Sequence, residues 1–314
     1  MGFTSDTVGG REVWVGERDQ LRIVLVPELG SKIVSLRCFG GREWLYQGSR
    51  PLGNNGYASA FDESDGRGWD EMFPNIDPCR VPTAPWQDVS LPDHGEVWSL
   101  PWQVASVSDN ALTLKVHGIR YPYELQKRLV LKEDHVVRFD YHVKNPTPFP
   151  MPFFWAAHPL LSVQPLDQVV LPEDCRDYVV SNSTLPNVQP EAVYQWPYIG
   201  ASQRLDVVAE ERSGEAHKVF FRNKMRVGEA AVASADGRER IDFRFSPEDI
   251  PHLAVWVNDG GWRHEHNLAL EPAIGFLDVL HAVDGPIPNE YILPYGHREW
   301  SLEVQLHCPL DGKQ

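Results

Sequence analysis

The residues LRIVLVPELGSKIVSLR, 21–37, already indicate a β protein. Residues 21–26 and 32–38 alternate apolar and polar side chains or are rich in β-branched ones, and Gly30 lies in the turn between them. A period of two over so short a run is typical of a half-buried strand. The stretch therefore predicts two strands joined by a turn.

Similar short runs recur along the chain, at 12–15, 111–116, 124–131, 136–143 and 300–306. Turn-forming pairs such as Gly9-Gly10 and Asp236-Gly237 separate such runs, with a spacing of roughly ten residues. No run combines helical periodicity with caps at both ends. Regular short strands with turn signals predict an all-β fold, either an antiparallel sandwich or a barrel.

Two regions, 48–102 and 145–200, break this alternation and are rich in Pro, Gly and Trp. Loops of such length inside a compact domain are usually functional. Neither region resembles a flexible linker, because both contain large apolar side chains that require burial. A single domain over residues 1–314 is the simplest prediction.

Charge and composition restrict the ligand. The 29 Lys and Arg residues against 44 Asp and Glu residues give a net charge of −15. An acidic surface repels phosphate backbones and anionic lipids, which argues against nucleic-acid and membrane partners and against a phosphorylated substrate. The 11 Trp, 10 Tyr and 13 Phe residues are a large aromatic share, and such rings fill β cores and face sugar rings. A neutral small molecule is favoured.

Targeting signals and cysteines predict a cytoplasmic protein. The N-terminus has no basic segment followed by an apolar one, and no stretch approaches the ~18 apolar residues of a membrane span. The four cysteines lie far apart and form no CxxC pair. This spacing indicates neither a zinc ribbon nor a disulfide-dense secreted scaffold.

Two short motifs contain candidate histidines. In LPDHGEVWSLPW, residues 91–102, His94 precedes a glycine, and Trp98 follows at a distance that allows an aromatic wall. In FFWAAHPLL, residues 153–161, His158 ends an apolar run before Pro159, where burial would lower the histidine pKa. The alternative for His94 is a loop histidine that is hydrogen-bonded to its own turn. The alternative for His158 is a core histidine whose hydrogen bonds are satisfied.

A third motif, NLALEPAIG at residues 267–275, places Glu271 inside an apolar strand. A buried carboxylate without a partner costs several kcal/mol. Glu271 is therefore either part of a structural ion pair, for instance with Arg298 or Arg80, or a candidate general base. In the second case desolvation raises its pKa toward neutrality.

The three motifs in this order, His94-Gly95, His158-Pro159 and Leu270-Glu271-Pro272, resemble the galactose mutarotase (aldose 1-epimerase) family. The opening residues 21–37 and the ending ILPYGHREWSLEVQL, 292–306, also resemble that family, so the likeness spans nearly the whole chain. It implies a large antiparallel β-sandwich of the galactose mutarotase-like type, a supersandwich, that binds a sugar.

The resemblance also implies roles for the motif residues. Glu271 would take the proton of the anomeric hydroxyl, His158 would protonate the ring oxygen, and His94 would orient the ligand. The ring then opens and recloses as the other anomer, with neither a cofactor nor a metal. The expected partner is a small-molecule sugar, and the chain is expected to be a monomer or a homodimer.

Two polar positions depart from the family pattern. Where relatives have an arginine, this chain has GWDEMFPNIDPCR, residues 68–80, so Arg80 is only the nearest candidate. Asp70 and Glu71 in that segment either bind sugar hydroxyls or cap a turn or helix start. The family's later aspartate is replaced by His217-Lys218 and is not assigned. Trp98 and Trp256 are candidates to stack on the sugar or belong to the core.

Four functions therefore compete. A mutarotase acting on a free neutral aldose is favoured over a hexose-6-phosphate epimerase, which requires basic residues at its site. A non-catalytic carbohydrate-binding protein does not need the Glu271–His158 pair. The fourth is a metal-dependent sugar lyase or deglycosidase in which His94, Glu96 and His158 or Glu271 hold a divalent ion.

Overall fold

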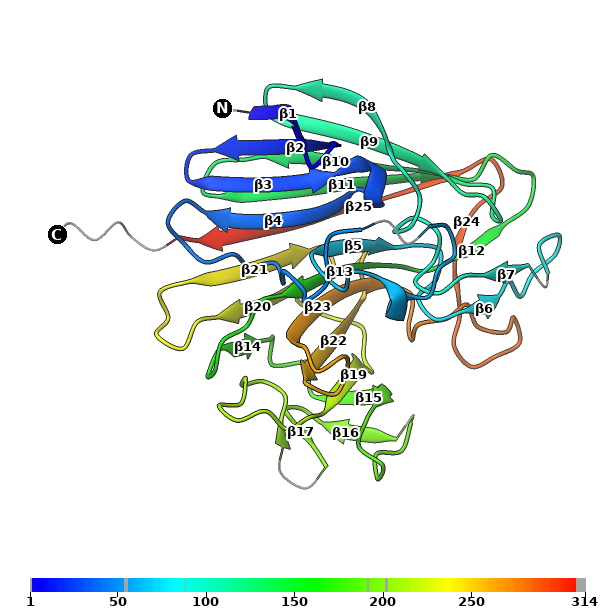
Figure 1. Cartoon of the computed structure of the whole chain (residues 1–314). Coiled ribbons are helices and arrows are strands. Elements are labelled where there is room, and N and C mark those ends of the chain that lie inside the picture. The colour runs from blue at the N-terminus through cyan, green and yellow to red at the C-terminus, as the bar shows by residue number, and fades with distance from the viewer. Residues whose placement is uncertain (1, 54–55, 88, 191, 201–202, 309–314) are drawn as a thin grey trace.

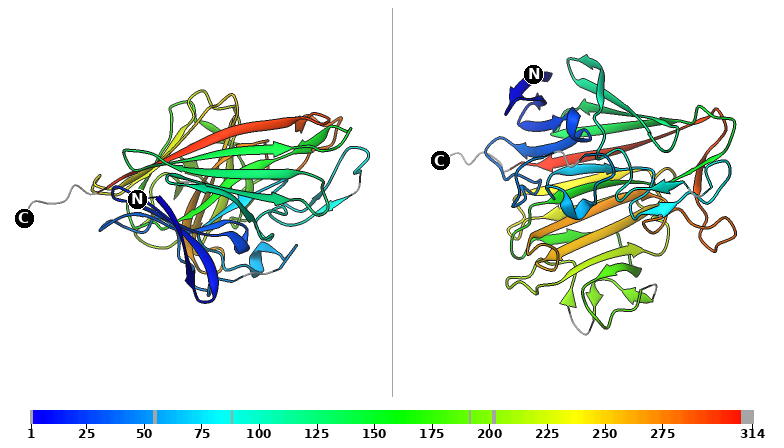
Figure 2. Two further views of the ribbon diagram at one scale, coloured as in Figure 1. Left: turned by 90° about the horizontal axis from the view of Figure 1, so that it is seen from above. Right: turned by 45° about the vertical axis from the view of Figure 1, so that its right-hand side comes forward.

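The computed structural model contains two large antiparallel sheets that pack against each other (Figure 1; Figure 2, left). It describes residues 2–53, 56–87, 89–190, 192–200 and 203–308. Within these residues there is no α-helix, and none of the helical turns is long and apolar enough to cross a bilayer. The predicted all-β fold class is confirmed.

The larger sheet has 11 strands and the smaller sheet has eight. In order across the larger sheet the strands are β1 (Gly2–Val8), β2 (Arg11–Arg18), β3 (Leu21–Val26), β4 (Lys32–Cys38), β5 (Trp69–Met72), β13 (Trp155–Leu161), β23 (His266–Ile274), β22 (His252–Asp259), β19 (Ala216–Phe221), β15 (Asp177–Ser183) and β16 (Val193–Gln195). Across the smaller sheet they are β14 (Gln168–Val170), β20 (Glu229–Ala233), β21 (Arg240–Phe245), β25 (His297–His307), β11 (Val136–Lys144), β10 (Glu124–Leu131), β9 (Ala111–His117) and β8 (Gln103–Ser108).

Short elements complete the fold. Three two-stranded ribbons pair β12 (Met151–Phe153) with β24 (Glu290–Ile292), β17 (Tyr198–Ile199) with β18 (Gln203–Arg204), and β6 (Cys79–Arg80) with β7 (Ser90–Leu91). Two 3₁₀ turns are η1 (Pro27–Leu29) and η2 (Phe61–Glu63).

Every run that alternation predicted as a strand lies within one, namely β2, β3, β4, β9, β10, β11 and β25. In β10 and along most of β25, buried residues alternate with half-buried or exposed ones, because one face packs on the core while the other is turned toward solvent. Period two is therefore a reliable signal for these strands.

The expectation of a long loop over residues 145–200 is wrong at β13. All residues of this strand are buried, because the core covers one face and loops cover the other. No alternation survives in such a strand. His158 was expected at the end of this strand but lies inside it, and Pro159 does not end the strand, which continues to Leu161.

The core between the sheets is aromatic. Trp69 of the larger sheet packs on Phe139 of the smaller one, with ring centroids 4.8 Å apart. Trp155 packs in the same way on Tyr141, also at 4.8 Å. These four rings of the aromatic surplus therefore hold the two sheets together.

A disulfide joins Cys38, at the end of β4, to Cys308, which follows β25, with a Cα–Cα distance of 5.6 Å. It links strands of different sheets across 270 residues of chain. The sequence analysis did not predict this pair, because the spacing of distant cysteines does not reveal their connectivity.

The Cys38→Ser variant should lower the free energy of unfolding by about 2–4 kcal/mol, because the cross-link restricts the unfolded chain. Urea denaturation of the oxidised protein measures the loss. Dithiothreitol should produce the same loss in the wild type and none in Cys38→Ser. Cys79→Ser removes a free cysteine and should keep the sensitivity to the reductant. Equal wild-type stability with and without dithiothreitol would contradict the assignment.

Candidate active site

A cavity of about 260 Å³ lies on the face of the larger sheet that is turned away from the smaller one. Its floor comes from β13, β23, β22, β19 and β15. The chain between β4 and β8 supplies further lining residues, and part of it lies in front of β13 and β23 in Figure 1. The lining residues are Phe61, Asp62, Ile76, Asp77, Asp93, His94, His158, Leu160, Asn182, Lys218, Trp256, Trp262, Glu271 and Asp278.

Strand register brings the floor residues together. The pairs on either side of His158 in the β13–β23 ladder place it opposite Glu271. The β19–β22 ladder places Lys218 opposite Trp256. Directly opposed residues point to the same face of a sheet, so segments far apart in the sequence contribute adjacent side chains to one surface.

The roof is a loop that positions His94. The residue has a φ of 59°, and Gly95 follows at 73° in a turn where a Cβ would lie 2.3 Å from the Phe73 carbonyl oxygen. Only glycine fits such a close approach. The indole of Trp98 donates a hydrogen bond of 3.0 Å to the carbonyl of Asp93 and so braces the same loop.

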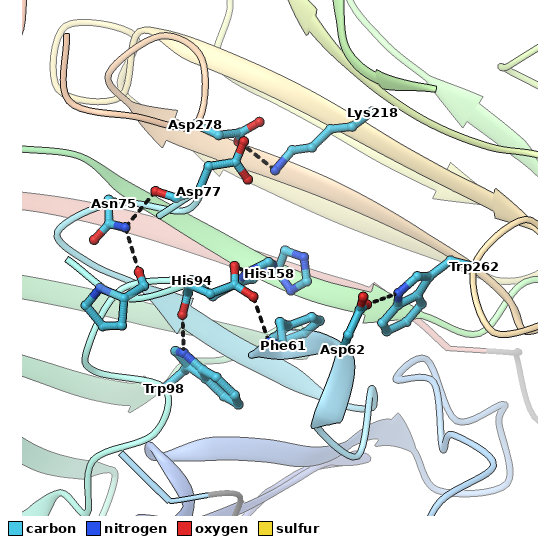
Figure 3. Close-up of polar contacts among 12 residues, drawn as sticks. Phe61, Asp62, Asn75, Asp77, His94, Trp98, His158, Lys218, Trp262 and Asp278 are labelled. Carbon is cyan, nitrogen blue, oxygen red and sulfur yellow. Dashed lines mark hydrogen bonds and ion pairs between the residues drawn. The ribbon is translucent and has the colours of Figure 1, made fainter. Parts of the chain in front are cut away.

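Aromatic contacts connect roof and floor. The ring of Phe61 in η2 stacks on His94, with centroids 3.9 Å apart and planes 5° apart. Phe61 also makes a T-shaped contact with His158, with centroids 5.3 Å apart, and the two histidine rings lie 5.4 Å apart. Figure 3 shows Phe61 and His94 beside His158, with the Lys218–Asp278 ion pair on another side of the site. Both histidines therefore line the same cavity.

Asp93 orients His94. The Nδ1 atom of His94 lies 2.7 Å from Oδ1 of Asp93, while Oδ2 accepts the backbone N–H of Phe61. Burial raises the pKa of Asp93, but the hydrogen bonds and charge of His94 and the backbone donors outweigh it and lower that pKa below its ordinary value. Asp93 is thus a carboxylate that accepts from Nδ1, which leaves Nε2 of His94 for a ligand.

His158 has a different environment. Its Nδ1 is buried and has no hydrogen-bond partner among the described residues, and its Nε2 lies 3.9 Å from Oε1 of Glu271. Burial and the nearby His94, Lys218 and Lys32 lower its pKa well below the ordinary value. Burial therefore favours the neutral imidazole of His158, and the direction of this pKa shift is the one that the sequence pattern predicted.

Glu271 shares Lys218 with Asp278. The Nζ atom of Lys218 lies 2.8 Å from Oε2 of Glu271 and 2.8 Å from Oδ1 of Asp278. Within the part of the chain that the structure describes, Oε1 of Glu271 accepts no hydrogen bond. Burial raises the Glu271 pKa above its ordinary value, although Lys218 opposes the shift. The predicted partners Arg298 and Arg80 were wrong, because Lys218 occupies that place.

Asp70 and Glu71 lie outside the cavity lining. Both belong to β5, not to a turn or helix start, and they point to opposite faces of the sheet. Asp70 pairs with buried Lys32 at 2.9 Å, and burial raises its pKa to about 6. Glu71 pairs with Lys127 at 3.3 Å between the sheets. Each carboxylate has a structural ion pair in place of contact with the cavity.

Of the other predicted site residues, one lines the cavity and two do not. Trp256 lines the cavity, whereas Trp98 is buried behind the His94 loop. Arg80 is exposed on β6 and does not belong to the cavity lining. Among the described residues, no arginine lines the cavity.

Several lining residues escaped the sequence reasoning, above all Lys218, Asp278 and Asp93. A lysine inside the apolar run AHKVFF was a usable signal, since a buried charge requires a partner. The Asp-His sequence at 93–94 was another. Asp278 lies in a loop after β23 and carries no signal of its own.

The metal site suggested for His94, Glu96 and His158 or Glu271 does not form. Oε1 of Glu96 accepts hydrogen bonds from the Tyr57 hydroxyl at 2.6 Å and from the Arg120 backbone N–H at 2.8 Å. Within the described ranges, these residues do not gather as a group of potential metal ligands.

Comparison with known proteins gives one consistent result. The sequence matches no protein-family model and no curated protein. The structure is similar to the Slr1438 protein of Synechocystis sp. PCC 6803, at a TM-score of 0.70 and 20% identity over 98% of both chains. It is also similar to a galactose mutarotase-like protein of Lactobacillus casei, at a TM-score of 0.69 and 19% identity over 98% of this chain and 100% of the other.

A galactose mutarotase related enzyme of Lactobacillus acidophilus has a TM-score of 0.71 and 13% identity, over 95% of this chain and 98% of that one. These structures cover nearly the entire length on both sides, and the motifs at His94, His158 and Glu271 had indicated the same architecture. The chain has the fold of the galactose mutarotase-like proteins.

Proposed function

We propose that this protein is an aldose 1-epimerase that interconverts the anomers of a free, neutral aldose. One observation carries the proposal: Glu271, His158 and His94 come from three distant segments and converge on one cavity. A buried carboxylate with a raised pKa opposite two imidazoles suits proton transfer at two oxygen atoms of one ligand. The shared fold with mutarotase-like proteins supports the same activity.

The reaction needs one acceptor and one donor. Glu271 takes the proton of the anomeric hydroxyl, the bond between C1 and the ring oxygen breaks, and a histidine gives a proton to that oxygen. Rotation about C1–C2 and the reverse transfers close the ring as the other anomer. The unbonded Oε1 of Glu271 is the atom that accepts the proton.

We assign the proton donor to His94 and not to His158, to which the resemblance gave that role. Burial lowers the pKa of His158 well below its ordinary value and so disfavours its charged, proton-donating form, and we assign His158 to hydrogen bonding with the sugar. His94 is held by the Asp93 carboxylate at 2.7 Å. A carboxylate that accepts from Nδ1 fixes the ring and supports proton transfer at Nε2.

The lining favours a neutral sugar over a phosphorylated one. Five of its residues are acidic (Asp62, Asp77, Asp93, Glu271 and Asp278) and one is a lysine. That lysine already pairs with two carboxylates. A phosphate group needs free basic groups, usually arginines, so a hexose-6-phosphate is disfavoured. Trp256 and Trp262 offer flat surfaces for a sugar ring.

The cytoplasmic location and the monomeric or dimeric state stay predictions. The Cys38–Cys308 disulfide weighs against the cytoplasm, because such bonds persist mainly in oxidising compartments.

Polarimetry and NMR exchange measurements on a panel of free aldoses test the activity. We expect the protein to accelerate anomer interconversion of at least one neutral aldose, without added metal. Sugar binding by calorimetry without any acceleration would instead identify a non-catalytic carbohydrate-binding protein. Acceleration confined to aldose 6-phosphates would overturn the neutral-substrate assignment.

The two histidines should differ in their contributions. His94→Asn should lower kcat by about 10²–10⁴-fold, the usual range for a lost general acid, whereas His158→Asn should raise KM more than it lowers kcat. Asp93→Asn should lower kcat without loss of fold, because it changes the orientation of His94. The variant His117→Asn, which changes an exposed histidine, serves as a control. A larger kcat loss in His158→Asn than in His94→Asn would reverse the assignment.

A further inference from the structure

A second cluster of potential ligands lies on the solvent face of the smaller sheet, on the strands β11 and β25. It consists of His142, His297 and Glu299. His142 stands directly opposite Glu299 in the β11–β25 ladder, and His297 precedes Glu299 by two residues. Alternation along a strand puts residues two apart on the same face. All three side chains therefore point outward from one patch of sheet.

The donor atoms of this cluster are close together. One ligand atom from each residue lies within 4.8 Å of the other two. Nε2 of His142 is 3.7 Å from Oε1 of Glu299, and the rings of His142 and His297 lie 5.2 Å apart at 27°. Ligands about 2.0–2.2 Å from a zinc ion lie roughly 3.3 Å from one another. Small side-chain rotations reach that spacing, since Glu299 and His297 are exposed.

We propose that His142, His297 and Glu299 form a surface site for a divalent transition metal of the zinc class. Two imidazoles and one carboxylate are ligands that zinc accepts, and three protein ligands leave one position of a tetrahedron for water. The cluster is on the opposite side of the sandwich core from the sugar cavity, so this inference is independent of the proposed epimerase activity.

Neighbouring charges permit a cation at this position. Lys144 stands opposite His297 in the ladder and is a basic residue on the same strand face. Its Nζ lies 3.8 Å from Oε1 of Glu124, whose carboxylate offsets its charge. Bound metal would tie β11 to the C-terminal strand β25 by side-chain bonds in addition to the ladder.

Isothermal titration with ZnCl₂ on the untagged full chain tests the site. We expect one zinc ion per chain and a rise in the thermal midpoint with zinc. His142→Gln, His297→Gln and Glu299→Gln should each weaken binding about tenfold or more. The matched control is His307→Gln, which removes an exposed histidine that has one carboxylate partner, Asp242, at the end of the same strand.

The absence of zinc binding by the wild type would overturn the proposal. So would affinity that the three ligand variants leave unchanged, or that His307→Gln lowers as much as they do. Circular dichroism of each variant shows that the fold is retained, as expected for substitutions on a solvent face. Mutarotation should be the same in His297→Gln as in the wild type, which separates this site from the sugar cavity.

Discussion

The Glu271→Gln variant is expected to lose about 10²–10⁴-fold in mutarotation rate, the range that a general base contributes. The substitution removes the only proton acceptor assigned to the anomeric hydroxyl while keeping size and polarity. Lys218 keeps its ion pair with Asp278 at 2.8 Å, so the variant should fold. Polarimetry of the α-to-β conversion, followed at saturating sugar, measures the loss.

Two controls sharpen this result. Glu229→Gln changes an exposed glutamate on β20, away from the cavity, and should keep the full rate. Calorimetry should show that Glu271→Gln still binds the sugar, because the aromatic walls and both histidines are intact. A Glu271→Gln protein that retains the wild-type rate would refute the proposed chemistry, even if other aldoses were substrates.

The sequence predicted those strands whose two faces meet different surroundings. In β3 and β10 one face is buried against the core and the other is partly or fully exposed, so the period of two is visible. In β13 and β19 every residue is buried. Their fully buried faces produce apolar runs that periodicity alone cannot classify.

The site was predicted where a residue conflicts with its local pattern. Glu271 interrupts an apolar strand, and His158 ends an aromatic run, so both stand out in the sequence. Lys218 gave a similar signal, but it stands where the family has an aspartate, and no role was assigned to it. Its role became visible only through the fold, because strand register brings it opposite Trp256 and within an ion-pair distance of Glu271.

The buried ion pairs explain why Asp70 and Glu71 could not be assigned correctly. Their partners Lys32 and Lys127 lie 38 and 56 positions away along the chain, and only sheet assembly brings them into contact. Local sequence indicates that an isolated carboxylate needs compensation. It does not indicate which distant lysine provides it.

The Lys218→Met variant should be the most strongly destabilised of the cavity variants, by about 3–5 kcal/mol, because it leaves Glu271 and Asp278 buried without their shared cation. Urea denaturation measures the loss. Lys218→Arg keeps the charge and should recover most of the stability. The double variant Lys218→Met/Asp278→Asn should be more stable than Lys218→Met, because only one of the two carboxylates is still charged.

The sign of the pH dependence separates this explanation from a simple packing defect. Lys218 lowers the Glu271 pKa against the effect of burial, so its removal raises that pKa further. When the pKa of a carboxyl group is higher in the folded state than its ordinary 4.5, the folded protein loses stability as the pH rises from the ordinary pKa to the folded-state pKa. The deficit of Lys218→Met should therefore be small near pH 4 and large near pH 8, whereas a packing defect is equal at both. The pH below which mutarotation falls should also move upward, because Glu271 must be deprotonated to act as the base.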